Sequence, residues 1–478
     1  MASSVVVMGL EESISRHRTC SLRINEVNMK MAPTLGNKEF LELKAMCRKK
    51  EDAALYHPWG TKPTEPLVLS FPYSQLVKKK QNISAMASPL ACQSLQNFAT
   101  AFHYCWTCPF TWDKTSKKFV ATKALHLLIT WIIVVFLVTP IVCGVCIVTI
   151  LLQIYGTISP PLTSFFVCVI IAILTFFVVT VELVMFLYVE EFTAGCNHLT
   201  QISRHDRKHA SPHRKIDPLG LFLNFNVALF SIYPYFLCPF LFYFDLDPGL
   251  LFTRYVLHLE LNTLLDQLVT QPLRFLQFLA ILQLCRLFPI LVSTFSLCIT
   301  IFLDAIHKLE SRAFLIRFYR SKADLQMRKY RELALVLKLV DGVVVPAAAI
   351  LMGLGLLLSV VFNFVTIKLY SVIPMPLYLY FPSVSVLIPV IIEALLPFGI
   401  SLNVKAVQLR NKWDRQLERC GDRKYVRRIL RAIKPFCINC GVAGYNVLKL
   451  VKGTKVWFYE QLLNYTISAL LTSTNLPA

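Results

Sequence analysis

The sequence predicts an all-α membrane protein with seven transmembrane helices, its N-terminus in the cytoplasm and its C-terminus extracellular. The chain has 478 residues, is 55% hydrophobic and has a mean hydropathy of +0.56, a composition that is unusual for a soluble protein. All but four of the 49 Lys and Arg residues fall in the segments 1–124, 190–218, 304–342 and 403–455, which alternate with almost uncharged stretches. Such basic segments mark the cytoplasmic side of multi-pass membrane proteins.

Six apolar stretches are long enough to cross the hydrocarbon core, which requires about 20 mainly apolar residues. Helices one to four are predicted within 125–303, and helices five and six within 343–402. The individual spans are 125–152, 162–189, 219–244, 275–303, 343–367 and 377–402.

The cytoplasmic segments differ in character. Residues 1–124 are predicted to be a partly disordered tail that ends in a short interfacial helix near Phe119. Good helix formers without Pro or Gly predict a helical extension over 304–342, and 403–455 is predicted as a basic helical segment. Both helical segments carry apolar stripes, so we expect them to pack together beneath the membrane.

The seventh span is predicted over 456–473, followed by an extracellular tail at 474–478. Glu460, Asn464, Ser468 and Thr472 recur every four residues and form one polar stripe on a helix, with Leu471 close to it. A membrane helix with such a stripe turns it towards water or protein. The stripe therefore predicts pore-lining residues at Asn464, Ser468, Leu471 and Thr472. An amphipathic helix on the membrane surface is the alternative interpretation.

Composition also excludes several classes of protein. The net charge of +21 lies at the ends of apolar spans, which argues against nucleic-acid binding. The outer connections contain no cysteine, so a disulfide framework is not expected. Cys105/Cys108 and Cys437/Cys440 form Cys-x-x-Cys pairs far apart in the sequence, and we predict no metal or cofactor site. No catalytic motif is recognisable, so an enzyme is not predicted.

Ionisable residues inside spans require a partner or water. Glu182 and Glu393 are predicted buried charges, and Arg286 is expected either to pair with a glutamate or to serve a ligand or ion site. Aromatic residues and prolines gather at the outer ends of the third and sixth spans, either as an interfacial belt or as the wall of an apolar pocket. The candidate pocket residues are Tyr233, Phe236, Gln283, Arg286 and Tyr380.

Near its end, the chain resembles the arthropod gustatory and odorant receptor superfamily. Lys434-Pro435-Phe436, Gly441, a basic patch and then Thr466 follow in the order found in that family. The terminal signature of the family is Thr-Tyr, five mostly apolar residues and Gln-Phe. Thr466 matches it, whereas Ile467 stands in place of Tyr and Ser473-Thr474 in place of Gln-Phe.

The resemblance implies a homo- or hetero-tetrameric, ligand-gated cation channel whose seventh helices line a central pore. It also implies a small-molecule pocket among the second, third, fourth and sixth helices. Carried over through Thr466, the gate falls at Leu470 and a polar pore position at Ser473. This register differs from the polar stripe, because Leu470 and Ser468 are about 200° apart on a helix.

The function expected from these observations is a chemosensory, gustatory-receptor-like cation channel in the plasma membrane. A multi-pass transporter and a non-conducting accessory protein are the alternatives. A G-protein-coupled receptor is not expected, because the charge pattern predicts a cytoplasmic N-terminus and the connection 245–272 has no cysteine.

An epitope tag placed after Ala2 should be stained by antibody only after the cells are permeabilised, because 1–124 is predicted to be cytoplasmic. Immunofluorescence on intact and permeabilised cells measures this directly. Staining of intact cells would overturn the predicted sidedness.

Overall fold

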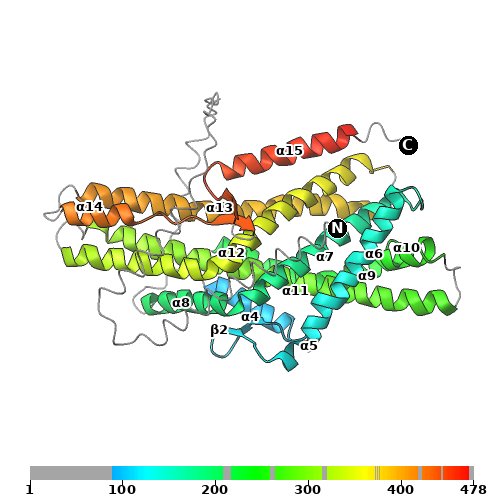
Figure 1. Cartoon of the computed structure of the whole chain (residues 1–478), viewed down its shortest axis with the longest axis horizontal. Helices are drawn as coiled ribbons and strands as arrows, with labels where there is room; N and C mark the ends of the chain where they lie inside the picture. The colour runs from blue at the N-terminus through cyan, green and yellow to red at the C-terminus, as the bar shows by residue number, and fades with distance from the viewer. Residues whose placement is uncertain are drawn as a thin grey trace. The chain divides into compact units, whose positions relative to one another are not determined.

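A computed structural model describes residues 89–207, 217–258, 264–314, 320–371, 373, 375, 377–417, 423–442 and 445–472. All of them belong to one compact unit, Ser84–Ala478. It is a bundle of long helices with two small β-hairpins (Figure 1). Residues 1–88, Ser473 and the tail 474–478 lie outside the described residues.

Six helical stretches are long and apolar enough to cross a membrane, and they coincide with the six clear spans predicted from the sequence. They are built from α5 (Leu125–Ile133), the π-helix η1 (Val134–Val138), α6 (Thr139–Ile154), α7 (Leu162–Leu187), α9 (Pro218–Tyr243), α11 (Leu264–Ser311), α12 (Arg320–Lys368) and α13 (Leu377–Leu417). The other described helices are α4 (Pro89–Ala101), α8 (Val189–Arg207), α10 (Pro248–Tyr255), α14 (Arg423–Ala432) and α15 (Thr454–Thr472). Helix α15 occupies the predicted seventh span but is not among the six apolar stretches, so the seventh crossing stays a prediction.

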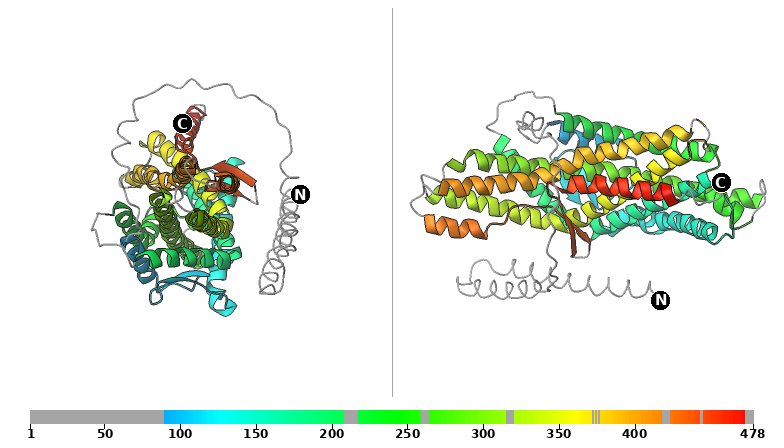
Figure 2. Two further views of the ribbon diagram at one scale, coloured as in Figure 1. Left: turned by 90° about the vertical axis from the view of Figure 1, so that its left-hand side faces the viewer. Right: turned by 90° about the horizontal axis from the view of Figure 1, so that it is seen from above.

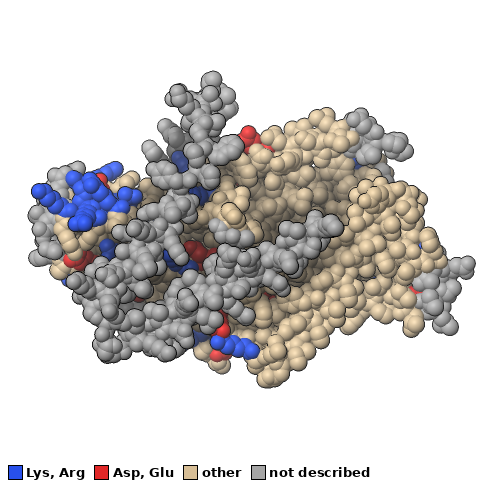
Figure 3. Space-filling model, viewed as in Figure 1, with Lys and Arg blue, Asp and Glu red and all other residues tan. Residues whose placement is uncertain are grey.

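Helix α11 is the buried axis of the bundle. The most apolar window of this helix is 89% buried, whereas the corresponding windows of the other five stretches are at most 50% buried. With 48 residues and a rise of about 1.5 Å per residue, α11 is far longer than a hydrocarbon core of about 30 Å. Helices α12 and α13, with 49 and 41 residues, are also longer than this core, and the three helices run side by side (Figures 1 and 2). On the face in Figure 3, charged side chains gather at the α14 end, and the surface of the opposite part is largely uncharged.

The extensions of α12 and α13 pack together around Tyr330. Its ring stacks on Phe436 at 4.1 Å between centroids and meets Trp413 edge-on at 5.6 Å. Its hydroxyl donates to the Lys434 carbonyl at 3.0 Å and accepts from the Phe436 amide at 3.2 Å. The apolar stripes of these segments thus form a packed core rather than a solvated loop.

The expected interfacial helix near Phe119 is wrong, because Phe119 lies on a β-strand. Strands β1 (Phe110–Asp113) and β2 (Lys118–Ala121) form an antiparallel hairpin. Asp113 closes its turn by accepting hydrogen bonds from Thr115 and Ser116, and these bonds hold the pKa of the Asp113 carboxyl well below its usual range. Phe119 is buried against Phe110 and Trp112, so packing on its own hairpin outweighs the attraction of the membrane interface.

Helix was expected throughout 403–455, but the second half of this segment contains a hairpin. Strands β3 (Asn439–Val442) and β4 (Tyr445–Lys449) pair antiparallel, with an irregularity between Cys440 and Gly441. A Cβ atom on Gly441 would lie 2.0 Å from the Tyr445 carbonyl oxygen, so this close approach of the two strands requires glycine.

Replacing Tyr330 with Phe should lower the midpoint of thermal unfolding, because it removes two hydrogen bonds and leaves a buried amide unpaired, a loss of about 1–3 kcal/mol. Unfolding of the purified chain in detergent, followed by intrinsic fluorescence, measures the shift. Tyr445→Phe is the matched control, since Tyr445 is 79% exposed. Equal midpoints for both variants would contradict the role of Tyr330 as a polar link.

Candidate functional site

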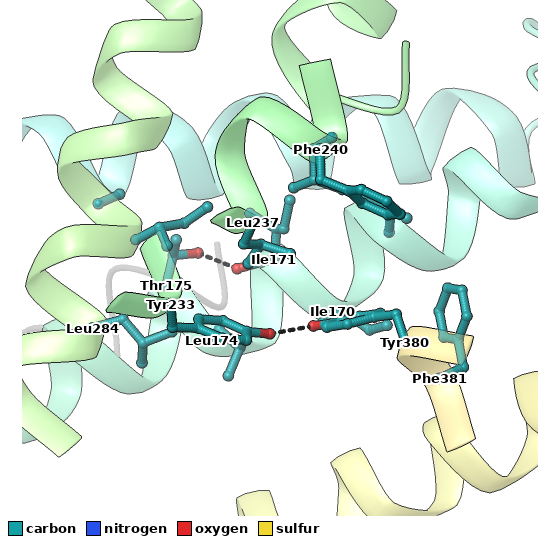
Figure 4. A pocket seen from close by; sticks show the side chains of 14 residues that line it. Ile170, Ile171, Leu174, Thr175, Tyr233, Leu237, Phe240, Leu284, Tyr380 and Phe381 are labelled. Atoms are coloured by element: carbon teal, nitrogen blue, oxygen red, sulfur yellow. Dashed lines mark hydrogen bonds between the residues drawn. The ribbon is translucent and has the colours of Figure 1, made fainter. Parts of the chain in front are cut away.

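An apolar cavity of about 50 Å³ lies among α7, α9, α11 and α13, the second, third, fourth and sixth predicted membrane helices (Figure 4). A volume of this size holds a few water molecules, so a larger ligand fits only if lining side chains move. Its lining is Val167, Ile170, Ile171, Leu174, Thr175, Tyr233, Leu237, Phe240, Leu241, Ala280, Ile281, Leu284, Tyr380 and Phe381.

Two tyrosines provide the distinctive polar feature of this wall. The Tyr233 hydroxyl on α9 donates to the Tyr380 hydroxyl on α13 at 2.8 Å (Figure 4). The other lining hydroxyl, of Thr175, donates to the backbone carbonyl of Ile171 at 2.8 Å and is occupied within its own helix. Because Tyr233 donates within the pair, the Tyr380 O–H is left to donate to a ligand, and the hydroxyl oxygens of the pair can accept from one.

Prolines interrupt both helices that carry these tyrosines. Pro234 follows Tyr233 directly, and Pro382 lies two residues after Tyr380, each inside its helix. A proline in a helix removes one backbone hydrogen bond and disturbs the preceding turn. In the membrane such positions need support from neighbouring helices, which gives the cavity wall more freedom than an unbroken helix would have.

Gln277 is a buried polar residue that is not among the predicted pocket residues. It lies on α11 at about the same helical angle as Ala280, Ile281 and Leu284, which line the cavity. Its side chain is 1% exposed, and neither its oxygen nor its nitrogen has a hydrogen-bond partner among the described residues. The sequence did contain a sign of this residue, since Gln277 is a polar side chain within an otherwise apolar predicted span.

Three of the predicted pocket residues lie away from the cavity. Phe236 points outward from α9 and is 73% exposed. Gln283 and Arg286 are buried on a different face of α11, where the loop after α4 meets them. Trp106 donates its indole N–H to Gln283 at 3.0 Å, and its carbonyl accepts from Arg286.

The two predicted buried glutamates have different environments. Glu182 is buried on α7 and accepts a hydrogen bond from Gln283, rather than pairing directly with Arg286. Glu393 is not buried, since its side chain is 45% exposed, and it forms an ion pair of 2.7 Å with Lys455. The prediction of a buried charge at Glu393 is wrong, because the side chain lies at the surface of the bundle, where Lys455 in the first turn of α15 pairs with it.

Helix α15 presents opposite faces to the bundle and away from it. Thr454, Phe458, Leu462 and Thr466 are buried, mainly against α12. The other face is exposed and carries all four predicted pore-lining residues, Asn464, Ser468, Leu471 and Thr472.

In the alternative register, Thr466 is on the buried face and Leu470 is half-buried. Ser473, its third residue, lies outside the described residues.

Each of the two cysteine pairs has one buried and one half-buried member, since Cys108 and Cys440 are buried and Cys105 and Cys437 are half-buried. Burial raises the pKa of Cys108 to about 12 and that of Cys440 to about 11. Among the described residues, no three His, Cys, Asp or Glu side chains gather as a metal site.

Comparisons with known proteins identify the fold. No protein-family model matches the chain, and no curated protein does. A structure of the insect olfactory receptor OR5 from Machilis hrabei in complex with eugenol superposes with a TM-score of 0.56 at 10% identity, over 80% of this chain and 98% of that receptor. A second structure of this receptor gives 0.53 at 11% identity, over 79% and 97%. The chain has the insect olfactory receptor fold.

This finding agrees with the superfamily that the end of the sequence resembles. At such low identity the agreement concerns the fold. The cavity between α7, α9, α11 and α13 is therefore a cavity of an olfactory-receptor fold.

Reversing either charge of the Glu393–Lys455 pair should destabilise the chain, and reversing both should restore most of the loss. Lys455→Glu brings two carboxylates together, whereas Glu393→Lys with Lys455→Glu rebuilds the pair in the opposite sense. Because both side chains are half-exposed, we expect a coupling free energy of about 1 kcal/mol or less. Thermal unfolding of the four proteins as a double-mutant cycle measures it, and strictly additive shifts would contradict a direct pair.

Proposed function

We propose that this chain is a subunit of a chemosensory cation channel of the plasma membrane, opened by a small molecule that binds the cavity between α7, α9, α11 and α13. The observation that carries this proposal is the position of the cavity: an apolar chamber with a tyrosine pair, inside a fold shared with an olfactory receptor whose structure contains eugenol. Ligand sites of this kind are mostly apolar with a few well-placed polar groups.

The lining supports a particular class of ligand. Aliphatic and aromatic side chains cover most of the wall, and no ionisable carboxylate, amine or guanidinium lines it. A neutral molecule of largely hydrocarbon character with one hydroxyl or carbonyl group fits this chemistry. Its polar group would replace one partner in the Tyr233–Tyr380 hydrogen bond. It would thereby alter the contact between α9 and α13.

The conduction path in this proposal runs along α15. The polar stripe of α15 faces away from the bundle, where a single chain in a membrane offers it only lipid. Assembly of several copies around α15, four if the resemblance holds, would bring the stripes together around water. Leu471 lies among the polar positions and is the proposed apolar constriction, since rings of apolar side chains gate pores by excluding water.

Helix α13 could transmit a movement from the cavity to the proposed pore helix α15. This helix contributes Tyr380 and Phe381 to the cavity, and further along it carries Glu393, which pairs with Lys455 on α15. Among the described residues, this is the one ion pair between α15 and another helix. In the proposed mechanism, displacement of α13 by ligand reaches α15 through this pair and through the packing of α15 on α12.

Expressed in cells under patch clamp, the chain should give an inward current that disappears when a large organic cation replaces sodium. Eugenol and its O-methyl ether are the first probes, because they differ by one hydrogen-bond donor. Tyr380→Phe should shift the half-maximal concentration for eugenol by about tenfold, corresponding to one hydrogen bond of about 1.4 kcal/mol, and should affect the ether less. Tyr425→Phe on α14 is the control. An unchanged eugenol response in Tyr380→Phe would remove the tyrosine pair from the site.

Ser468→Leu and Thr472→Leu should reduce single-channel conductance severalfold, because each replaces a polar wall position by an apolar side chain that disfavours water. Ile467→Leu, exposed but off the stripe, is the matched control. If both leucine variants conduct like the unmodified chain, the stripe does not line the path. Surface expression, measured in parallel, separates lost conduction from lost folding.

A further inference from the structure

The hairpin of β3 and β4 exposes an unusual amount of apolar surface. Tyr445 and Val447 are each 79% exposed, and Val442 is 54% exposed. Lys449 on the same strand is exposed as well, and Val447 is the extra residue of β4 at the irregularity opposite Cys440 and Gly441. Figure 2 shows this hairpin projecting sideways from the bundle, across the direction of the long helices.

The base of the hairpin is held at the end of the sixth predicted span. A Cβ atom on Gly399 would meet Leu450 at 2.8 Å and Ile438 at 3.9 Å, so the two ends of the hairpin lie directly against α13 at this residue. One turn later, the Asn403 side-chain amide donates to the Phe436 carbonyl at 2.8 Å. The predicted span ends at Leu402, so the hairpin leaves the bundle at the boundary between hydrocarbon and water.

An open groove separates β4 from the first turns of α15. It encloses about 440 Å³ and is lined by Asn446, Val447, Leu448, Lys449, Val451, Gly453, Thr454 and Trp457. The turn that shapes it is fixed by Thr454, whose hydroxyl donates to the Lys449 carbonyl at 2.9 Å and accepts from the Val451 amide at 3.0 Å. The groove thus has an apolar floor, an indole at one side and a cation at its rim.

The positive charge beside the groove favours an anionic partner. Lys449 and Lys452 are exposed, and neither forms an ion pair with a described acidic side chain. Cations next to exposed aromatic and aliphatic residues at the cytoplasmic boundary are typical of contacts with anionic lipid. A second copy of the chain is a poorer match, because a chain of net charge +21 mostly offers like charges.

We propose that the β3–β4 hairpin and this groove bind an anionic phospholipid of the cytoplasmic leaflet. The acyl chain occupies the groove between Val447, Val451 and Trp457, and the phosphate contacts Lys449 and Lys452. Thr454 and Trp457, which line the groove, belong to the first turn of α15, so the bound lipid sets where this turn sits relative to the bilayer. The proposal depends on the cytoplasmic placement of 403–455 and is independent of conduction.

Photocrosslinking in the full-length chain tests it. The photoreactive amino acid p-benzoylphenylalanine replaces Tyr445 or Val447, one at a time, and membranes of expressing cells are irradiated. The purified chain is then analysed by intact mass and by gel. Phe236, which faces outward from a membrane helix, is the lipid-facing control position, and Tyr425 on α14 is the control position beyond the spans.

Adducts of phospholipid mass at Tyr445 and Val447, richer in anionic lipid than those at Phe236, are the expected result. Lys449→Glu combined with Lys452→Glu should lower the anionic fraction about tenfold and leave the adducts at Phe236 unchanged. A band of doubled chain mass would show that a second copy of the chain covers the hairpin. Lipid adducts no more frequent than those at Tyr425 would show that the hairpin is exposed to water. Either result overturns the proposal.

Because the readout is a covalent adduct, a chain that carries no current can still bind the lipid, and a conducting chain can still fail this test. The two proposals are therefore judged separately. If both hold, bilayers with and without anionic lipid should differ in the eugenol response of the unmodified chain and not in that of the double lysine variant.

Discussion

Polar side chains on the central helix must find their partners inside the protein, because the hydrocarbon around the bundle offers none. Arg286 and Gln283 on α11 meet this requirement through Trp106, a residue that lies before the first membrane helix. An unpartnered arginine at this depth costs at least about 2.5–3.5 kcal/mol. The segment from α4 to β2 thus contributes to the stability of the helices that follow it, although it precedes the first predicted span. Its attachment is completed by Asn97, which donates to Asn224 on α9 at 2.7 Å.

This arrangement leaves two faces of α11 with different tasks. One face holds Gln283 and Arg286 against the N-terminal segment, and the other contributes Ala280, Ile281 and Leu284 to the cavity. The helices around α11 differ in continuity. Helix α13 is the most interrupted of those described, with three internal prolines. Pro397 removes the amide that would bond to the Glu393 carbonyl, so α13 is weakened where it pairs with α15.

The parts of the structure that follow from local sequence were predicted well. The six apolar stretches appear as helices because span length and hydropathy depend on few long-range contacts. The tyrosines of the cavity were among the predicted pocket residues, since aromatic residues beside prolines at helix ends are visible in the sequence. Which face a residue occupies was predicted less well. Phe236 was a candidate because aromatic residues gather at the outer end of its span, and Arg286 because it is ionisable within a span. Neither pattern determines helix rotation, which for Gln283 and Arg286 depends on packing that involves Trp106.

The two hairpins and the position of Glu393 show a second limit. Residues 110–121 and 439–449 are too short and too mixed in composition to display a clear alternation, and their strands are stabilised by contacts distant in sequence. Asn197, for example, bonds both backbone groups of Phe119 from α8 at 2.9 and 2.7 Å. Similarly, Glu393 meets Lys455 from a segment 62 residues away. One further pattern in the sequence would have predicted α4. Its apolar residues have the spacing of one helical face and are all buried, namely Ala91, Leu95, Phe98 and Phe102.

In the proposed channel, the outward polar stripe of α15 also bears on assembly. A newly synthesised copy that has not yet assembled would hold Asn464, Ser468 and Thr472 against lipid or leave this helix outside the bilayer. Polar groups held against hydrocarbon cost free energy. Assembly of the proposed channel would remove this cost, so the stripe that lines the pore would also favour the complete complex over the lone copy.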